Sequence, residues 1–412
     1  MSDTSSDTLT RSRAIALFLA FAFAYFLSTL IRAITATLAP TLVQEFALTA
    51  GDLGLLAGGY FFGFALTQLP LGRWLDALGP KQVLLGFLAV AVLASVAFAS
   101  ATSFVGLIAA RTLIGVGVSA CLMAPLTSYR RWYAPGAQMR ANSWMLMTGA
   151  LGMVASTLPV QWLIPLTGWR FLFLVLGGLF ALSMLLIAWQ VPPSPPRERP
   201  ASEGAPVTPG YAEVWRNPFF RSLAPYAFVG YGGLVAMQTL WAAPWMVKVA
   251  GYTQAEAAAG MFWLNVAMMF AFLLWGWANP WLTRQGLSAT RLMKIGLPVN
   301  LLLIAVITLS GSALGDVTAL VWTLYCVTCT VGSLAQPAVG MAFAPQFAGR
   351  ALSAYNLMVF AGVFAVQWGV GLMIDAFRAG GWSEPAAYQG AMGVYGLCGL
   401  WAYVHLLRAK TP

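Results

Sequence analysis

The stretch from Ala14 to Ala36 is an apolar segment that contains a single charged residue, Arg32. It is long enough to cross a bilayer, because a membrane-spanning helix needs about 20 apolar residues that each rise 1.5 Å. A charged side chain inside such a segment costs roughly 2.5–3.5 kcal/mol even on a lenient insertion scale. Arg32 is therefore either an arginine that reaches the bilayer interface with its long side chain, or a functional residue that faces a water-filled cavity and binds an anion. We adopt the second interpretation as the working hypothesis.

Apolar segments of the same kind recur along the whole chain. Hydrophobic residues make up 60% of the 412 residues and charged residues only 8%, whereas soluble globular proteins average roughly 25% charged residues. Each long apolar segment is therefore interpreted as a membrane-spanning helix. The predicted spans are residues 14–38, 52–71, 82–100, 104–127, 141–164, 170–190, 222–246, 259–278, 293–310, 317–338, 351–375 and 388–407. The sequence thus predicts an all-α membrane protein with twelve transmembrane helices.

A polar, proline-rich segment at 191–210, VPPSPPRERPASEGAPVTPG, separates the sixth predicted span from the seventh. Such a composition does not build a core and is typical of an exposed linker. The predicted organisation is a cytoplasmic tail at 1–13, a six-helix bundle at 14–190, a cytoplasmic linker at 191–220, a second six-helix bundle at 221–407 and a cytoplasmic tail at 408–412.

The two predicted bundles repeat each other. Matching residues recur in the same order at offsets of 204 to 210 residues, and the series includes Pro40 and Pro244, Thr49 and Thr253, Asp52 and Glu256, Gly72 and Gly276, Arg140 and Arg350, and Gln161 and Gln367. Two pseudo-symmetric six-helix bundles with a ligand site between them at the midplane are a transporter architecture. The substrate site is therefore expected between the halves.

The distribution of basic residues predicts the orientation in the membrane. Seventeen Lys and Arg residues fall in segments on the side of the termini, three fall on the other side (Arg170, Lys248 and Arg378), and Arg32 and Arg111 lie within spans, which accounts for all 22. Positive residues mark cytoplasmic loops, so both termini are expected in the cytoplasm. Arginines outnumber lysines, as in GC-rich bacterial genomes, so we expect a multi-pass protein of the bacterial inner membrane.

The loop after the second predicted span, Gly72 to Lys81, carries a candidate gate. Asp76 lies at a helix end, where it can pair with a basic residue or with the positive end of a neighbouring helix, in a latch that forms in one state only. The loop resembles the G-x-x-x-D-R-x-G-R-R/K motif of the major facilitator superfamily, with Ala77 and Pro80 in place of basic residues. The resemblance implies gating roles for Gly72, Asp76, Gly79 and Lys81.

Two further segments strengthen the resemblance, which covers almost the whole chain. Arg111-Thr-Leu-Ile-Gly115-Val-Gly117 resembles the R-x-x-x-G-x-G motif of helix four, and Gly168-Trp169-Arg170-Phe171 resembles the turn that enters helix six. The resemblance implies the major facilitator fold and transport by alternating access.

The first span resembles the organic-anion branch of that superfamily. In that branch an arginine precedes a helix-end proline by eight residues and binds the anionic substrate, as Arg32 precedes Pro40 here. A second basic residue is often present on helix seven of that branch, and this chain has none there. Arg111 is the candidate for the second charge. It is equally well interpreted as a packing residue that bonds backbone carbonyls.

The remaining candidates for substrate binding are polar and aromatic residues on helices that line the cavity in this family. A phenol or an indole combines apolar surface with one hydrogen-bond donor, which suits an anion with a carbon skeleton. The predicted substrate site consists of Arg32, Arg111, Tyr25, Ser28, Thr29, Tyr231, Gln238, Trp241 and Tyr325.

Several absences restrict the chemistry. No Asp or Glu lies clearly within a span, and the single histidine, His405, is near the end of the last one. The four cysteines form no metal-binding pattern, so neither a metal nor another cofactor is predicted. An embedded nucleophile–histidine–acid set is missing, so we do not expect an enzyme. Coupling to protons, coupling to sodium and anion exchange all remain open.

The predicted function is secondary active transport of a small organic anion, most simply a carboxylate, by a monomer that imports or exchanges it. Nucleic acid is not an expected partner, because the basic residues are dispersed among loops. Proton-coupled efflux of amphipathic drugs or metabolites is the alternative, favoured by the aromatic content. The fifth span, however, lacks the Gly-Pro and Gly-Gly elements of the exporter motif G-x-x-x-G-P-x-x-G-G. A non-transporting sensor is a remote alternative, because the loops are short.

Overall fold

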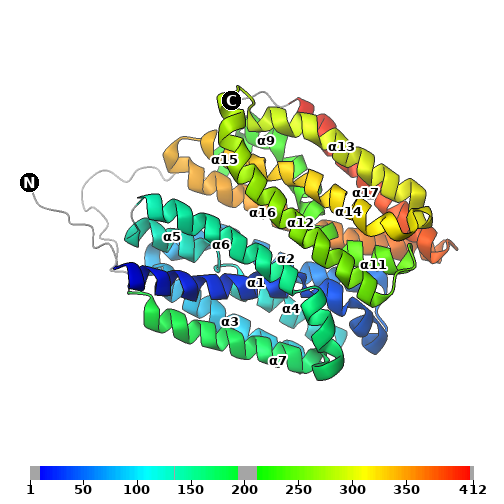
Figure 1. Cartoon of the computed structure of the whole chain (residues 1–412), viewed down its shortest axis with the longest axis horizontal. Helices are drawn as coiled ribbons and strands as arrows, with labels where there is room; N and C mark the ends of the chain where they lie inside the picture. The colour runs from blue at the N-terminus through cyan, green and yellow to red at the C-terminus, as the bar shows by residue number, and fades with distance from the viewer. Residues whose placement is uncertain (1–9, 134, 194–210, 409–412) are drawn as a thin grey trace, which may run out of the picture.

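The computed structural model describes residues 10–133, 135–193 and 211–408, and within these ranges the chain consists of helices and their connecting turns, with no strand. Figure 1 shows two groups of helices side by side, the N-terminal half in blue to green and the C-terminal half in green to red. The N-terminal half contains α1 (Arg11–Phe46), α2 (Ala50–Leu78), α3 (Pro80–Ala99), α4 (Phe104–Val118), α5 (Met123–Trp132), α6 (Pro135–Ala155) and α7 (Leu158–Gln190).

The C-terminal half contains a larger number of shorter pieces. Its elements are α8 (Tyr211–Arg216), α9 (Pro218–Pro225), η1 (Tyr226–Tyr231), α10 (Gly232–Ala236), η2 (Met237–Trp241), α11 (Ala242–Lys248), α12 (Gln254–Arg284), α13 (Ala289–Ser310), η3 (Gly311–Val317), α14 (Thr318–Cys329), η4 (Thr330–Leu334), α15 (Ala335–Met341), α16 (Pro345–Ala379) and α17 (Glu384–Leu407).

Nine helices of the described chain are long and apolar enough to cross a membrane by length and composition. One of these, Ala289–Met341, is 53 residues long and holds two predicted spans. The other two predicted spans correspond to α6 and to the run from α9 to α11. All twelve predicted spans therefore fall on helical segments, and the chain is an all-α, multi-pass membrane protein.

The helix boundaries differ from the predicted spans where the structure divides a span, as it does in the fifth span. The fifth span is predicted as one segment, 141–164, but α6 ends at Ala155 and the chain continues as the first part of α7. Pro159 stands at the start of that second piece, where the missing N–H of proline is tolerated. The chain then turns at Gly168, whose φ of 73° suits glycine, before the sixth span begins.

The predicted repeat is visible in the local structure at the starts of α2 and α12. The Thr49 hydroxyl accepts a hydrogen bond from the Asp52 N–H, and the Asp52 carboxylate accepts one from the Thr49 N–H. Thr253 and Glu256 form the same reciprocal pair one half-chain later. Each pair satisfies backbone donors that the first turn of a helix leaves free. Equivalent positions of the two halves therefore begin their helices in the same way.

We use the name terminal face for the end of the bundle where α1 begins and α17 ends, and distal face for the opposite end, where α1 ends and α2 begins. Between the distal face and the middle of the bundle, α2 and α16 pack closely against each other across the two halves. Gly54 lies against the backbone of Gln367, and Gly371 lies against the backbone of Ala50, so a side chain at either glycine would collide with main-chain atoms. Small residues permit this approach between helices.

Candidate functional site

Arg32 lies where the two halves meet. Its guanidinium carbon is 5.5 Å from the ring centroid of Phe64 on α2 and 5.9 Å from that of Phe360 on α16. Arg32 as a whole is partly exposed, but its Nε is buried and has no hydrogen-bond partner. The side chain is thus directed at the interface between the halves and away from the bilayer interface that the alternative interpretation required.

The electrostatic neighbours of Arg32 are phenols. The side chains of Tyr25, Tyr60 and Tyr231 are close enough to interact electrostatically with the guanidinium. No carboxylate of the described residues has such an interaction with it. Tyr231 is the last residue of η1 and is partly exposed, whereas Tyr25 is buried. Helical turns of the π type such as η1 often occur at functional sites. Arg32 is therefore a cation with aromatic neighbours from both halves and no counter-ion in the described part of the chain.

Arg111 on α4 is buried and is used mainly in packing, although its Nε has no hydrogen-bond partner. Its two terminal nitrogens donate to the carbonyl oxygens of Ile31, at 2.8 Å, and Arg32, at 3.1 Å. Its guanidinium carbon also lies 5.0 Å from the ring centroid of Tyr60. Of the two interpretations of Arg111, this geometry favours the bonding of backbone carbonyls. Arg111 fixes the turn of α1 that carries Arg32, so its contribution to the site is positional.

The polar residues near Arg32 on α1 are used within the N-terminal half. The Ser28 hydroxyl donates to the Val118 carbonyl at 3.4 Å. The Thr29 hydroxyl donates to two carbonyls of its own helix and packs against Gly152 of α6. Both side chains therefore contact neighbouring helices. Of the three residues of α1 predicted to surround Arg32, Tyr25 is the one that interacts electrostatically with it.

Three predicted residues of the C-terminal half are buried and paired within that half. Gln238 donates from Nε2 to Asn265 Oδ1 at 2.8 Å, and the indole N–H of Trp241 donates to the Gln367 carbonyl at 3.1 Å. The hydroxyls of Tyr325 and Tyr395 are 2.7 Å apart. Tyr231 is thus the predicted C-terminal residue that the structure brings to Arg32. Phe64, Phe360 and Tyr60 lie at the site and were not predicted.

The predicted gate loop on the terminal face makes few contacts. Gly72 and Asp76 are exposed, and Asp76 has no ion-pair partner among the described residues. Gly79, with φ of 80°, ends α2, and Lys81 donates from Nζ to the Ala188 carbonyl of α7 at 2.6 Å. Among the residues whose side chains the structure describes, Asp76 therefore forms no such latch.

A different carboxylate joins the halves on the distal face. The two oxygens of Asp375, near the end of α16, accept hydrogen bonds from the Ala50 N–H at 3.1 Å and the Gly51 N–H at 2.7 Å. These are free donors of the first turn of α2, where a negative charge is favourable. Asp375 therefore acts as a cap for a helix of the opposite half.

A cavity of about 550 Å³ opens between the halves on the distal side of Arg32. Pro40 and Pro244, which are equivalent in the repeat, both line it. Its walls are mostly apolar, and Lys248 and Glu384 form an ion pair of 3.2 Å in its lining. A cavity of this size and character is typical of sites for small molecules.

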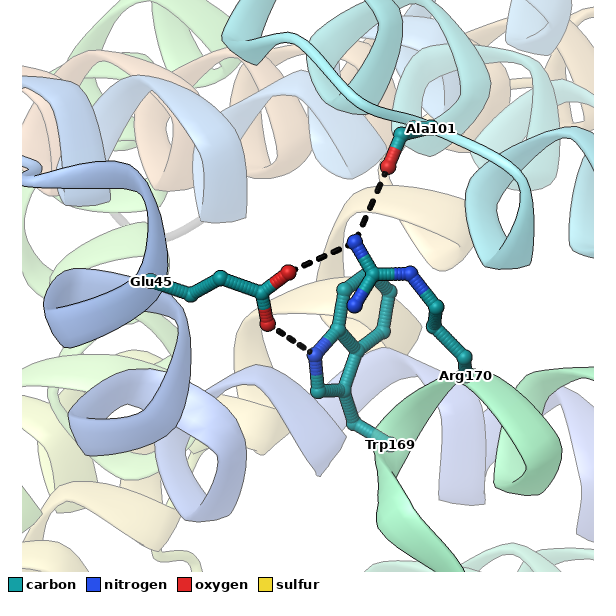
Figure 2. Close-up of polar contacts among 4 residues, drawn as sticks. All are labelled: Glu45, Ala101, Trp169 and Arg170. Atoms are coloured by element: carbon teal, nitrogen blue, oxygen red, sulfur yellow. Dashed lines mark hydrogen bonds and ion pairs between the residues drawn. The ribbon is translucent and has the colours of Figure 1, made fainter.

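The predicted turn into the sixth span forms a polar cluster on the distal face of the N-terminal half (Figure 2). The Glu45 carboxylate accepts a hydrogen bond from the Trp169 indole N–H at 2.7 Å and lies 2.6 Å from a guanidinium nitrogen of Arg170. Arg170 also stacks over the Trp169 ring and donates to the Ala101 carbonyl. The cluster ties the end of α1 to the turns that precede α4 and the sixth span.

Metal-binding groups of three or more His, Cys, Asp or Glu residues are not found in the described ranges. Cys326 and Cys329, with their CxxC spacing, are free and buried. The Asn300 side chain donates to the Tyr325 carbonyl and to the Cys329 sulfur. The CxxC pair is therefore used as packing surface.

The helical architecture and the sequence both identify the protein family to which this chain belongs. The sequence model of the Major Facilitator Superfamily matches residues 21–367. The chain belongs to the Major Facilitator Superfamily. This membership places it among transporters and not among enzymes.

Comparisons with individual proteins agree with the family. The chain is 33% identical over 165 residues to the niacin transporter of Acinetobacter baylyi, covering 40% of this chain and 37% of the relative. It is 24% identical over 247 residues to the probable sulfoacetate transporter of Cupriavidus necator, covering 57% of each chain. The matches span less than two-thirds of either relative.

The fold is similar to that of a solved bacterial homolog to the human lysosomal transporter Spinster, in an inward-facing and unoccupied conformation. The TM-score is 0.78 at 20% identity, and the match covers 97% of both chains. At this identity the likeness concerns the fold alone.

Proposed function

We propose that this protein is a secondary active transporter that moves a small organic anion, carrying a carboxylate, across the bacterial inner membrane by alternating access. The observation that carries the proposal is Arg32, a cation between the two halves that has no carboxylate partner in the described part of the chain. An intramembrane charge is costly and normally has a partner or a water-filled cavity. A carboxylate of the substrate supplies the missing negative charge.

The named relatives support the same class of substrate. Niacin and sulfoacetate, from which the two relatives take their names, both carry acidic groups. A guanidinium binds a carboxylate through two parallel hydrogen bonds, which gives both strength and orientation. On this proposal Arg32 holds the carboxylate, Tyr25 and Tyr231 border it from the two halves, and Arg111 fixes the position of Arg32.

We place the terminal face in the cytoplasm, following the excess of basic residues on that side. The distal face then faces outward, where α2 and α16 are joined through Asp375. The absence of an ion pair at Asp76 in the described residues fits a state in which the cytoplasmic latch is open. Proton symport, sodium symport and exchange are all compatible with this site.

The test is uptake of labelled organic anions into proteoliposomes that contain the purified protein. Arg32→Gln should abolish uptake and remove the thermal stabilisation that a bound anion confers, since a ligand raises apparent stability by RT ln(1 + [L]/Kd). Arg291→Gln, an exposed arginine at the start of α13, is the matched control and should retain both. Retained uptake and retained stabilisation in folded Arg32→Gln would refute the proposal.

Efflux of an amphipathic compound is the second candidate function. The observation that favours it is the mostly apolar cavity of about 550 Å³ on the distal side. Expression in a host that lacks its drug pumps distinguishes the two functions. Increased resistance that survives Arg32→Gln would favour efflux, whereas unchanged susceptibility would leave anion transport as the function.

A further inference from the structure

Phenylalanines of both halves form a continuous contact beside Arg32. We call it the aromatic seam and define it by Phe61, Phe62 and Phe64 on α2 and by Phe360 and Phe364 on α16. The ring centroids of Phe64 and Phe360 are 4.3 Å apart, and those of Phe62 and Phe364 are 5.3 Å apart. Gly58 packs against the Phe364 ring, so the contact continues toward the distal face. The seam therefore joins α2 to α16 across the two halves beside Arg32.

Arg32 interacts with one ring from each half at the inner end of this seam. Its guanidinium carbon lies within 6 Å of both the Phe64 and the Phe360 centroids, which is the range of a cation–π interaction. Such interactions strengthen when the cation is desolvated, and the Nε of Arg32 is buried without a hydrogen-bond partner. The two rings therefore compensate part of the charge of Arg32 in this conformation, beside the phenols of Tyr25, Tyr60 and Tyr231.

The same contact depends on the relative position of the halves. Arg32 and Phe64 belong to the N-terminal half, whereas Phe360 belongs to the C-terminal half. If α2 and α16 separate on the distal side, Phe360 moves away with its own half and Arg32 loses one of its two rings. An uncompensated guanidinium attracts an anion more strongly than one that faces two rings, so the anion has different affinities for the two states. A ligand shifts a conformational equilibrium only through such a difference.

We propose that Phe64 and Phe360 couple substrate binding at Arg32 to the opening of the distal side. In the empty protein, Arg32 binds both rings and holds the two halves together. An anion that pairs with the guanidinium neutralises its charge, weakens its attraction to the rings and thereby releases the seam. The inference rests on the proposed anion-binding role of Arg32 and adds the means by which that binding changes the conformation.

The first experiment measures the conformation without any substrate. Spin labels on Gln44→Cys and Gln254→Cys, exposed residues of α1 and α12, report the distance between the halves on the distal side. The exposed Cys398 is replaced by serine in all variants, because the other three cysteines are buried. Phe360→Leu keeps an apolar side chain and removes the π face. It should increase the ratio of distal-open to distal-closed protein by about threefold to tenfold.

Two comparisons separate coupling through Arg32 from simple apolar packing. In an Arg32→Gln background, Phe360→Leu should change the ratio by about threefold less than it does when Arg32 is present, because only the contacts of Phe360 with the α2 rings are then lost. Phe364→Leu is the matched control, since Phe364 belongs to the seam but does not contact Arg32, and its effect should be the same in both backgrounds. Equal effects of Phe360→Leu with and without Arg32 would overturn the proposal. Phe64→Leu replaces Phe360→Leu in the same comparison if the latter does not fold.

The second experiment adds an anion, with nicotinate and D-glucuronate as probes. A saturating anion should shift the unmodified protein toward the distal-open distance and reduce the difference between it and Phe360→Leu. A bound anion, detected by thermal stabilisation, that leaves this difference unchanged would overturn the release step. The substrate-free comparison does not depend on which anion is carried. Failure of both probes to bind therefore counts against the proposed function, while the background comparison still decides the role of the rings.

Discussion

Replacement of Asp375 by asparagine should weaken the contact that joins the two halves on the distal face. Its two oxygens accept hydrogen bonds from Ala50 N–H, at 3.1 Å, and Gly51 N–H, at 2.7 Å. Hydrogen bonds to a charged group contribute about 1.5–3 kcal/mol each. Asparagine keeps one acceptor but loses the charge and the second acceptor, and Asp375 is partly exposed. We therefore expect a loss of about 1–2 kcal/mol from the distal-closed state.

A loss of this size should change the ratio of closed to open protein by about fivefold to thirtyfold. The distance between labels at Gln44→Cys and Gln254→Cys measures that ratio. Asp52→Asn is the control, because Asp52 caps the same helix through Thr49 of its own half. It should lower thermal stability without a comparable change in the label distance. If Asp375→Asn left the distance distribution unchanged, the assignment of this cap as a closure between the halves would be wrong.

Three further changes test the packing described above. Gly54→Ala introduces a methyl group against the Gln367 backbone and should prevent closure of α2 on α16, which the same label distance detects. Arg111→Ala leaves the carbonyls of Ile31 and Arg32 without their donor and should lower the free energy of unfolding by about 3 kcal/mol or more, measured by thermal or denaturant unfolding. Glu45→Gln removes an ion pair whose side chains are 43% and 35% exposed, so the expected loss in the same assay is about 1 kcal/mol or less.

The sequence predicts best those features that depend on short segments. The twelve spans follow from runs of apolar residues, and Thr49 with Asp52 and Thr253 with Glu256 follow a local capping pattern that the structure repeats in both halves. That Arg32 is a candidate functional residue could also be predicted, because the free-energy cost of a charge within a membrane span does not depend on the rest of the fold. The boundaries are predicted less accurately where the structure divides a span, as between Ala155 and Leu158 in the fifth span, whereas the turn at Gly168 lies between two predicted spans as expected.

The neighbours of Arg32 could be predicted only in part. Helical spacing shows that Ser28 and Thr29 lie near Arg32 on α1, but it does not show which helix each side chain meets, and both contact α4 or α6. Phe360 comes from the other half, more than 300 residues along the chain, and only the packing of α2 on α16 brings it to the site. Tyr60 and Phe64 are four residues apart on one helical face, a spacing that gives a weak signal for a shared environment.

The two halves repeat each other in sequence, but they differ in charge at the position of Arg32. The position equivalent to Arg32 at the offset of 204 is Ala236, which is fully buried. On the proposed mechanism the N-terminal half therefore holds the anion, and Tyr231 is the phenol that the C-terminal half brings to Arg32. Tyr231→Phe should raise the Kd of a bound carboxylate by about threefold to tenfold, the effect of one lost hydrogen bond, with little change in unfolding.

Tyr395→Phe is the matched control, because the Tyr395 hydroxyl is paired with Tyr325 within the C-terminal half. It should lower thermal stability and leave the Kd unchanged. Isothermal titration with nicotinate measures both affinities. An unchanged Kd in Tyr231→Phe, together with a raised one in Tyr395→Phe, would place the anion deeper in the C-terminal half than Arg32 allows. That result would contradict the asymmetric site, because a carboxylate held by Arg32 must lie where the two halves meet.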